Sequence, residues 1–254
     1  MRRPPQRSLA LWAALTTLAA CTTLAPVDLS TWVTDGAGTW TLETLNAAND
    51  TVVQTANTDP GVFFDPTAQA QGRALGGTIT VTDTGDDDFI GFVLGYTPGA
   101  ITAQNTDYLL IDWKQADQDY SDLGTAKAGL SISRVTGPLR EASGPWAHDP
   151  NDGVSELARA RTLGTTGWDA NRPYSFQIEF TATRVHVTID GTTELDLSGT
   201  FTNGAFGFYN YSQPDVRYAG LQTRRIQTLP WWLLIGLIAI ALSIRISKKL
   251  RNKP

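Results

Sequence analysis

Apolar and polar residues alternate through much of the middle of the chain, which is the pattern of half-buried β-strands. Residues 76–83 (GGTITVTD) put Ile79 and Val81 on one face and threonines on the other. Residues 174–180 and 184–189 alternate in the same way, with large apolar side chains at every second position. Because successive strand side chains point to opposite faces, each segment is predicted to bury one face and leave the other polar.

Two further segments are almost continuously apolar. Residues 88–96 (DFIGFVLGY) and 107–115 (DYLLIDWKQ) predict central strands that are buried on both faces. Asp190-Gly191, between two alternating segments, predicts a two-residue hairpin turn because both residues tolerate positive φ. Other segments with strand patterns lie at 128–135, 193–197, 204–211 and 216–222.

One segment has a helical pattern. Residues 152–161 (DGVSELARAR) predict a short helix that begins near Asp152, whose side chain would cap it. Many strands with one short helix predict an all-β fold, an antiparallel β-sandwich. About 205 residues lie between the two ends of the chain, a length that all-β sandwiches often reach as one domain.

The N-terminus has the layout of a secretory signal. Basic residues precede an apolar run at 8–20, which is shorter than the ~20 apolar residues that span a bilayer. The run ends at Cys21 in LAAC, which resembles the lipobox of bacterial lipoproteins, where the cysteine is lipidated and becomes the mature N-terminus. Residues 1–21 are therefore predicted to be a signal peptide with an acyl anchor on Cys21. An ordinary signal peptide with a chance cysteine is the alternative.

The C-terminus predicts a transmembrane helix at 229–246. Trp231 and Trp232 stand where an interfacial aromatic belt would lie, and Arg245 can reach back to the interface. The tail at 247–254 is basic, which predicts that it stays cytoplasmic. The alternative is a cleaved sorting tail, because bacterial sorting signals also combine an apolar helix with a basic end.

Charge is unevenly distributed along the chain. Of 20 basic residues, eight lie in the two ends, so the middle keeps 12 against all 25 acidic residues, a charge of −13. Such a surface argues against nucleic acid as a partner, because affinity for nucleic acid rests on basic residues that neutralise phosphates. With its flanking membrane signals, the chain is predicted to be a membrane-anchored protein of the cell envelope. Its middle would face the periplasm or the exterior.

Catalytic chemistry has little support in the sequence. Of the two histidines, His148 lies in a loop pattern and His186 on the outward face of a strand. No G-x-S-x-G elbow, glycosidase carboxylate pattern or Gly-rich phosphate loop occurs. A single cysteine excludes an internal disulfide and a cysteine-cluster zinc site. We therefore predict that the protein is not an enzyme, with neither catalytic nor organic-cofactor residues.

Aspartate-rich turns suggest calcium. Twenty of the 25 acidic residues are aspartate, and TDTGDDDF gathers Asp83, Asp86, Asp87 and Asp88 between two strands. Asp59 lies in a second such turn, NTDPG. Carboxylate oxygens suit Ca²⁺, and adjacent like charges are relieved by a cation. We take these five as candidate metal ligands. The alternative is that aspartate here only forms turns and caps through local hydrogen bonds.

Two tryptophans in loop-like stretches could bind a ligand. Trp146 lies in SGPWAHD and Trp168 in TGWDANRP. An aromatic face can stack on a sugar ring, so both are candidate glycan-stacking residues. Burial as core or loop anchors is the alternative, because large rings are usually inside.

The middle of the chain resembles the C-terminal domain of thrombospondins. The order and spacing hold over about residues 28–222, and the segments that carry the likeness are 52–61, GGTITV, 86–96, DWKQ at 112–115, 129–140, Gly167-Trp168 and 204–222. The resemblance implies a jelly-roll sandwich of the concanavalin or legume-lectin type that binds calcium and mediates adhesion or matrix contacts. It also implies that the turn at 86–88 belongs to a calcium-bearing loop region.

The same resemblance has clear limits. The family's calcium repeats, EGF-like modules and coiled coil are missing, and no R-G-D sequence occurs, so integrin binding is not carried over. The predicted function is a membrane-anchored, calcium-binding adhesion or recognition module for an extracellular glycan or a matrix or surface protein. A structural envelope or biofilm protein without a small ligand is the alternative. A carbohydrate-active enzyme with a lectin fold is a third alternative, which no catalytic motif in the sequence supports.

Overall fold

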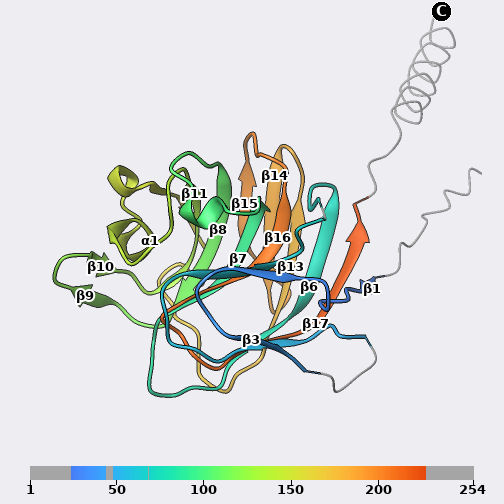
Figure 1. The fold of residues 1–254 in the computed structure, drawn as a ribbon, viewed down its shortest axis with the longest axis horizontal. Helices are drawn as coiled ribbons and strands as arrows, with labels where there is room; N and C mark the ends of the chain where they lie inside the picture. Colours follow the sequence, from blue (N-terminus) through green and yellow to red (C-terminus); the bar gives the residue numbers. More distant parts are fainter. Residues whose placement is uncertain (1–23, 44–47, 68, 227–254) are drawn as a thin grey trace, which may run out of the picture.

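Two antiparallel β-sheets form the body of the protein, with a small hairpin and short helices at one side (Figure 1). The computed structural model describes residues 24–43, 48–67 and 69–226. Strands occur from Ala25 to Arg225, and segments far apart in the sequence pair within each sheet. The fold is the all-β antiparallel sandwich that the strand patterns predict.

The first sheet has eight strands in the order β15-β14-β13-β6-β17-β4-β3, and β1 pairs with β17. The strands are β1 Ala25–Pro26, β3 Trp40–Leu42, β4 Val52–Gln54, β6 Arg73–Val81, β13 Tyr174–Phe180, β14 Arg184–Ile189, β15 Thr192–Ser198 and β17 Val216–Arg225. The last strand in the chain, β17, thus lies inside the sheet and pairs along its length with β6.

The second sheet has seven strands in the order β12-β11-β8-β7-β16-β5-β2. The strands are β2 Val33–Gly36, β5 Gly61–Phe64, β7 Phe89–Tyr96, β8 Tyr108–Lys114, β11 Gly129–Val135, β12 Val154–Arg159 and β16 Ala205–Tyr211. Every residue of β7, β8 and β16 is buried. The continuous apolar runs therefore form central strands, as predicted.

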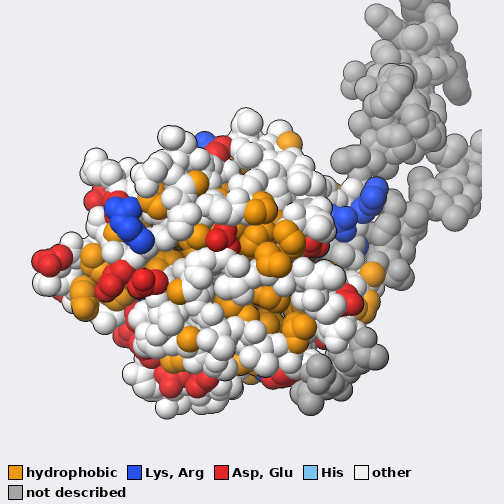
Figure 2. All heavy atoms as spheres, in the orientation of Figure 1, with side chains coloured by type: hydrophobic (Ala, Val, Ile, Leu, Met, Phe, Trp, Pro, Cys, Tyr) orange, Lys and Arg blue, Asp and Glu red, His pale blue; other side chains and the backbone are white. Residues whose placement is uncertain are grey.

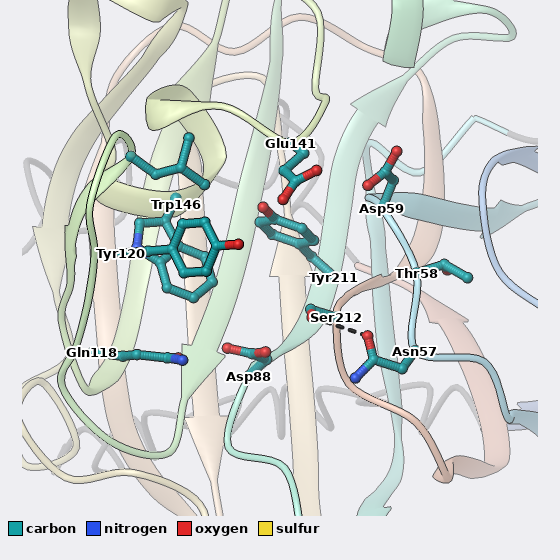
Figure 3. A pocket seen from close by; sticks show the side chains of 11 residues that line it. Asn57, Thr58, Asp59, Asp88, Gln118, Tyr120, Glu141, Trp146, Tyr211 and Ser212 are labelled. Atoms are coloured by element: carbon teal, nitrogen blue, oxygen red, sulfur yellow. Dashed lines mark hydrogen bonds between the residues drawn. The ribbon is translucent and has the colours of Figure 1, made fainter.

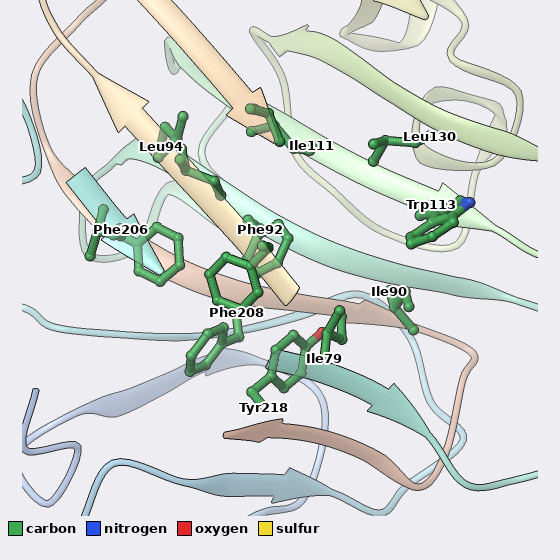
Figure 4. Close-up of a cluster of buried hydrophobic side chains, with 14 of the residues drawn as sticks. Ile79, Ile90, Phe92, Leu94, Ile111, Trp113, Leu130, Phe206, Phe208 and Tyr218 are labelled. Atoms are coloured by element: carbon green, nitrogen blue, oxygen red, sulfur yellow. The ribbon is translucent and has the colours of Figure 1, made fainter. Parts of the chain in front are cut away.

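Both faces of the seven-stranded sheet are covered. Ile90 and Phe92 of β7 point into the main core between the sheets, where aromatic and aliphatic side chains interdigitate (Figure 4). Phe89 and Val93 point to the opposite face and join a second apolar cluster. The elements over that face include the 3₁₀ helix η1 Ala100–Thr102, the helix α1 Ser143–Ala147 and the hairpin of β9 Gln118–Tyr120 and β10 Gly124–Ala126. A second 3₁₀ helix, η2 Pro150–Asp152, follows α1.

The predicted alternation is confirmed in the eight-stranded sheet. Ile79 and Val81 are buried, whereas Thr78 and Thr80 are half-buried and Thr82 is exposed. Strand β13 buries every second residue from Tyr174 onward, as its pattern predicts. The turn between β14 and β15 has positive φ at Asp190 (48°) and Gly191 (77°), so the predicted hairpin is also confirmed.

The predicted helix at 152–161 is wrong. Val154–Arg159 is the edge strand β12, which pairs with β11, and the only α-helix in the described residues lies earlier, at Ser143–Ala147. Leu157, which a helix would have turned inward, is 44% exposed on the edge strand. Local helix propensity is small per residue, so pairing with a long buried neighbour outweighs it.

Several expectations fall outside the described residues. These are the signal at 1–21 with Cys21, the helix at 229–246 and the tail at 247–254. Within the residues that the structure describes, no helix is long and apolar enough to cross a membrane.

Candidate functional site

A hollow of about 310 Å³ lies beside the β9–β10 hairpin on the outer face of the seven-stranded sheet. Its walls come from that hairpin, from α1, from the end of β16 and from the loop at 57–59 (Figure 3). The side chains that line it are Asn57, Thr58, Asp59, Asp88, Gln118, Tyr120, Leu123, Glu141, Trp146, Tyr211 and Ser212. Acidic side chains are prominent on this side of the molecule, to the left in Figure 2.

The sheet beneath the hollow contributes one row of side chains. Lys114 of β8, Phe89 of β7 and Tyr211 of β16 are paired in register across the three strands, so they share one face. The Phe89 and Tyr211 rings stack with centroids 5.9 Å apart. Trp146 meets both rings edge-on, at 5.7 Å from Phe89 and 5.9 Å from Tyr211. This aromatic packing fixes α1 over the sheet.

Trp146 also connects α1 to the hairpin. Its indole Nε1 donates to the carbonyl oxygen of Gly124 at 3.1 Å. Tyr120, on the facing strand of the hairpin, lies edge-on to the Trp146 ring at 5.8 Å and is 52% exposed. The hollow therefore has a buried ring in its wall and an exposed ring at its mouth.

A buried ammonium lies behind the wall of the hollow, against Asp88, Gln118 and Trp146, which line it. The Lys114 side chain is fully buried, and its Nζ donates to Asp88 Oδ1 at 2.6 Å, to Asp87 Oδ1 at 3.1 Å and to Gln118 Oε1 at 2.8 Å. The same nitrogen lies 5.0 Å from the centroid of the Trp146 ring. Carboxylates and a ring face together offset the cost of burying this charge.

The structure brings together three of the five predicted metal ligands. Carboxylate oxygens of Asp86, Asp87 and Asp88 lie within 4.8 Å of one another. Burial, followed by the charge on Asp88, raises the pKa of Asp86 to about 6. Lys114 contacts Asp87 and Asp88, whereas Asp86 accepts from the Asn57 amide, so Asp86 is the carboxylate of the cluster that no ion pair among the described residues reaches.

The other two candidate ligands lie apart from that cluster. Asp83 Oδ2 accepts the backbone N–H groups of Gly85 at 2.9 Å and Asp86 at 2.7 Å, so its carboxylate shapes the turn. Asp59 is exposed and lines the hollow with Asp88. The five aspartates thus divide into a cluster, a turn-forming residue and a residue across the hollow.

The two candidate tryptophans have different positions. Trp146 is 4% exposed and lines the hollow. Trp168 is 1% exposed in the main core, and its Nε1 donates to the carbonyl oxygen of Asp88 at 3.1 Å. Trp168 therefore anchors the strand that carries the aspartate cluster, and Trp146 is the tryptophan available to a ligand in the hollow.

His148 ends α1 and forms a buried ion pair. Its Nε2 lies 2.9 Å from Asp112 Oδ2 and its Nδ1 lies 3.2 Å from Glu156 Oε2. Burial by itself lowers the pKa of His148, but the Asp112 and Glu156 carboxylates outweigh it and raise the pKa to about 9. His148 is therefore a cation at neutral pH and joins α1 to strands β8 and β12.

This network does not have the geometry of a serine hydrolase. Ser131 Oγ donates to Asp112 Oδ1 at 2.8 Å, while His148 contacts the other oxygen of the same carboxylate. The carboxylate therefore lies between the hydroxyl and the imidazole, whereas an activated serine must contact the imidazole directly. His186, on β14, contacts Thr193 Oγ1 at 3.1 Å.

Sequence reasoning missed several residues of the hollow. No sequence pattern assigns a binding role to Tyr120, Glu141 or Tyr211, which line the hollow, or to Lys114 behind its wall. One signal was present, since Lys114 ends a strand pattern whose other residues are mostly apolar, and a lysine buried in a strand requires acidic partners.

The fold belongs to the class of lectin-like β-sandwiches. The chain superposes on the CBM66 carbohydrate-binding module from Bacillus subtilis with a TM-score of 0.53 at 14% identity, covering 76% of this chain and 95% of that one. It superposes on the VIP36 exoplasmic/lumenal domain in its Ca²⁺/Man-bound form with a TM-score of 0.52 at 16% identity, covering 79% and 85%. At these identities the likeness concerns the fold.

Within that class, the chain belongs to the thrombospondin C-terminal region family, which it matches over residues 38–227. It is 27% identical to Thrombospondin-4-B of Danio rerio over 196 residues, which is 70% of this chain and 20% of that protein. It is 26% identical to human cartilage oligomeric matrix protein over 196 residues, which is 70% of this chain and 25% of that protein. The chain thus spans a quarter or less of these relatives, and the predicted family is confirmed.

Proposed function

We propose that this protein is an extracytoplasmic recognition module that binds a glycan in the hollow beside the β9–β10 hairpin. The observation that carries the proposal is the combination of an exposed ring, Tyr120, with a buried ring, Trp146, around polar side chains. Sugar-binding sites combine apolar ring faces with a small number of placed polar groups. Lectin-fold relatives include a carbohydrate-binding module and a mannose-bound domain, which supports the same ligand class.

The lining offers partners for sugar hydroxyls. Gln118 presents its amide Nε2, and Asp59 and Glu141 present carboxylates. Ser212 Oγ already donates to Asn57 Oδ1 at 3.1 Å, and Asn57 Nδ2 donates to Asp86. A carboxylate can accept from two neighbouring hydroxyls, which is a strong, charge-assisted arrangement. Binding is proposed rather than catalysis, because Ser131 and His148 are separated by the Asp112 carboxylate.

The test is glycan binding by the full-length protein and by Tyr120→Ala. Tyr120 is half-exposed, so its replacement should leave the melting temperature unchanged and weaken glycan binding by about tenfold or more, the loss of one stacking contact. Leu157→Ala, a similarly exposed apolar residue on the edge strand β12, is the matched control. Unchanged glycan affinity in Tyr120→Ala would remove the hollow as the binding site.

Calcium is proposed as a second component, bound at Asp86, Asp87 and Asp88 with Asp59 and Asp83 as flanking carboxylates. The raised pKa of Asp86 supports it, because a divalent cation would relieve the same excess negative charge. Lys114 already neutralises part of the cluster, so weak binding is expected. If Ca²⁺ binds, saturation at 100 times its Kd stabilises the fold by about 2.7 kcal/mol. An identical melting temperature in Ca²⁺ and in EDTA would contradict this.

We also propose that the protein is anchored to a membrane and mediates adhesion through the hollow. In Figure 1 the hairpin and α1 lie on the opposite side of the molecule from β1 and the end of β17, so a ligand in the hollow would approach away from both ends of the described chain. Replacing Cys21 with Ser should abolish incorporation of labelled palmitate if this residue carries the anchor. Persistent labelling would contradict lipidation at Cys21.

A structural envelope protein without a small ligand remains the second candidate function. It is favoured by the extent of aromatic packing around Trp146, which also serves to fix α1. In that case deletion of the protein would weaken the envelope or a biofilm, whereas Tyr120→Ala would behave like the unaltered protein.

A further inference from the structure

The hollow beside the β9–β10 hairpin carries uncompensated negative charge at its mouth. Asp59, Asp88 and Glu141 line it, and Asp88 contacts Lys114. Within the described residues, no hydrogen bond or ion pair reaches the carboxylates of Asp59 and Glu141. Lys114 cannot supply one, because its three N–H groups are engaged by Asp87, Asp88 and Gln118.

The hydroxyl of a largely buried tyrosine points into the same space. Tyr211 is 4% exposed, and its ring is packed against Phe89 and Trp146. Its hydroxyl lines the hollow, is directed towards Glu141 in Figure 3, and has no hydrogen-bond partner among the residues that the structure describes. Because this hydroxyl faces the hollow, it is free to form a hydrogen bond with a ligand there.

The carboxylates of the hollow act on this hydroxyl. Burial, and then the charges on Glu141, Asp59 and Asp88, raise the pKa of Tyr211 well above its ordinary value. The same carboxylates that disfavour a phenolate would favour a cation at this point.

The contacts of the Lys114 ammonium, behind the wall of the hollow, show which kind of cation these side chains can bind. The Lys114 ammonium is held by carboxylate oxygens on one side and by the Trp146 and Phe89 rings, at 5.0 and 5.3 Å, on the other. The mouth of the hollow repeats this chemistry with Asp59, Glu141 and the exposed Tyr120 ring. Ring faces attract alkylammonium groups but supply none of the 6–8 oxygens that Ca²⁺ requires.

We propose that the glycan bound in the hollow carries a protonated amine, as a sugar with a free amino group does. This inference rests on the proposed function and names its ligand class. The ammonium group would lie between Glu141 and Asp59 and donate to the Tyr211 hydroxyl, with the sugar ring against Tyr120. Gln118 Oε1 accepts from Lys114, but its Nε2 has no hydrogen-bond partner among the described residues. This amide favours a sugar over a lysine side chain, because the lysine stem has no hydroxyl group to accept from it.

The experiment compares two forms of one glycan on the full-length protein. Isothermal titration would use the β-1,4-linked trisaccharide of glucosamine and its fully N-acetylated form, at pH 6 and 0.15 M salt in EDTA. Acetylation removes the charge and keeps the ring. We expect the free amine form to bind at least about tenfold tighter, the scale of a partly desolvated ammonium–ring and carboxylate contact.

Variants locate the effect. Glu141→Gln and Asp59→Asn should each reduce the preference for the amine several-fold without lowering the melting temperature, since both residues are exposed. Glu179→Gln is the matched control, because Glu179 lies on the eight-stranded sheet in an ion pair with Arg224. A preference that falls equally in Glu179→Gln would reflect the overall acidic charge and would overturn the site.

The possible results distinguish a failure of the amine preference from a failure of glycan binding itself. Equal affinity for the two trisaccharides overturns the amine preference and leaves glycan binding intact. No binding of either, in EDTA or in Ca²⁺, overturns both. Trilysine binding as tightly as the amine trisaccharide would show that the hollow binds a cationic peptide, which also overturns the inference.

Discussion

At the scale of single residues, two buried cations stabilise the outer face of the seven-stranded sheet. Lys114 and His148 each contact a buried aspartate, Asp88 and Asp112 respectively. Asp112 and Lys114 alternate with apolar residues on β8, so both lie on the face that α1 covers. These pairs place charge in the protein interior, where each charged group needs its partner to offset the cost of its burial.

Replacing Lys114 with Met should destabilise the fold strongly. The substitution leaves Asp87 and Asp88 without their ammonium, and removing one partner of a buried pair costs about 3–5 kcal/mol. Lys127→Met is the control, because the Lys127–Asp117 pair is exposed and solvent screening leaves it little effect on stability. The free energy of unfolding in urea measures both. Similar values for the two variants would contradict the structural role of Lys114.

The His148 pair predicts a pH dependence. The pKa of His148 is raised from 6.5 to about 9 in the folded state, so its stabilisation is complete below about pH 6.5 and is lost as pH rises towards 9. The expected loss is at most roughly 3 kcal/mol.

Urea unfolding between pH 6 and pH 9.5 would measure this effect. Asp112, Glu156 and Arg159 are the charged groups around the ring, and His148→Gln should flatten the slope. An equal slope in His148→Gln would assign the dependence to another group.

At the scale of elements, the positions of the β9–β10 hairpin and of α1 depend on side-chain contacts. The hairpin pairs with itself, outside both main sheets, and α1 has five residues. Neither is long enough to be stable by its backbone bonds. Trp146, Lys114 and the bond from Gly144 N to Asp152 Oδ2 therefore determine where the walls of the hollow stand.

Trp146→Phe should loosen the hairpin while leaving the sheets intact. A phenyl ring keeps much of the packing but removes the indole N–H that bonds to Gly124. Hydrogen exchange of the amides at 118–126 should accelerate about fivefold or more, which corresponds to the loss of about one hydrogen bond. Amides of β7 are the internal control. Unchanged exchange in the hairpin would mean that the indole bond does not hold it.

Long-range pairing dominates at the scale of the whole molecule. Strand β17 pairs with β6, β4 and β1, so the C-terminal end of the described chain closes the eight-stranded sheet around segments from its beginning. Strand β16 likewise joins β7 to β5 in the other sheet. The main core draws side chains from both sheets, which makes the sandwich one cooperative unit.

A chain that stops after Asp215 should therefore not fold. It would lack β17, leaving β6 and β4 without their common neighbour and exposing the core around Tyr218. A chain that stops at Ile226 retains the strand and should unfold cooperatively. Circular dichroism on heating distinguishes them. A cooperative transition in the shorter chain would contradict the central role of β17.

Local patterns predicted individual strands well. Alternation in β6 and β13 and continuous burial in β7 and β8 follow from the side-chain period of two and from cover on one face or both. The pattern gave a wrong prediction at β12. This six-residue segment is compatible with a helix or an edge strand, and its pairing with β11 makes it a strand. The strand patterns predicted a sandwich, and the family resemblance added its lectin-like type, which periodicity does not define.

The hollow shows the corresponding limit for a site. Asp88 is predictable as a candidate ligand because it is adjacent in the chain to Asp86 and Asp87, whereas Tyr120, Glu141 and Tyr211 come from separate segments that no sequence spacing connects. The position of Lys114 against Asp88 depends on the register of β7 and β8. Contacts of this kind arise from strand pairing, which a linear pattern does not encode.

The sequence by itself determined the class of fold, the faces of most strands, the family and the acidic character of the middle of the chain, because these follow from local periodicity, motifs and composition. Only the tertiary structure decided that the ammonium of Lys114 neutralises part of the aspartate cluster, that Trp168 is buried in the core and that Trp146 lines a hollow. The physical reason is that burial and charge compensation depend on neighbours distant in the chain, and strand register brings those neighbours together.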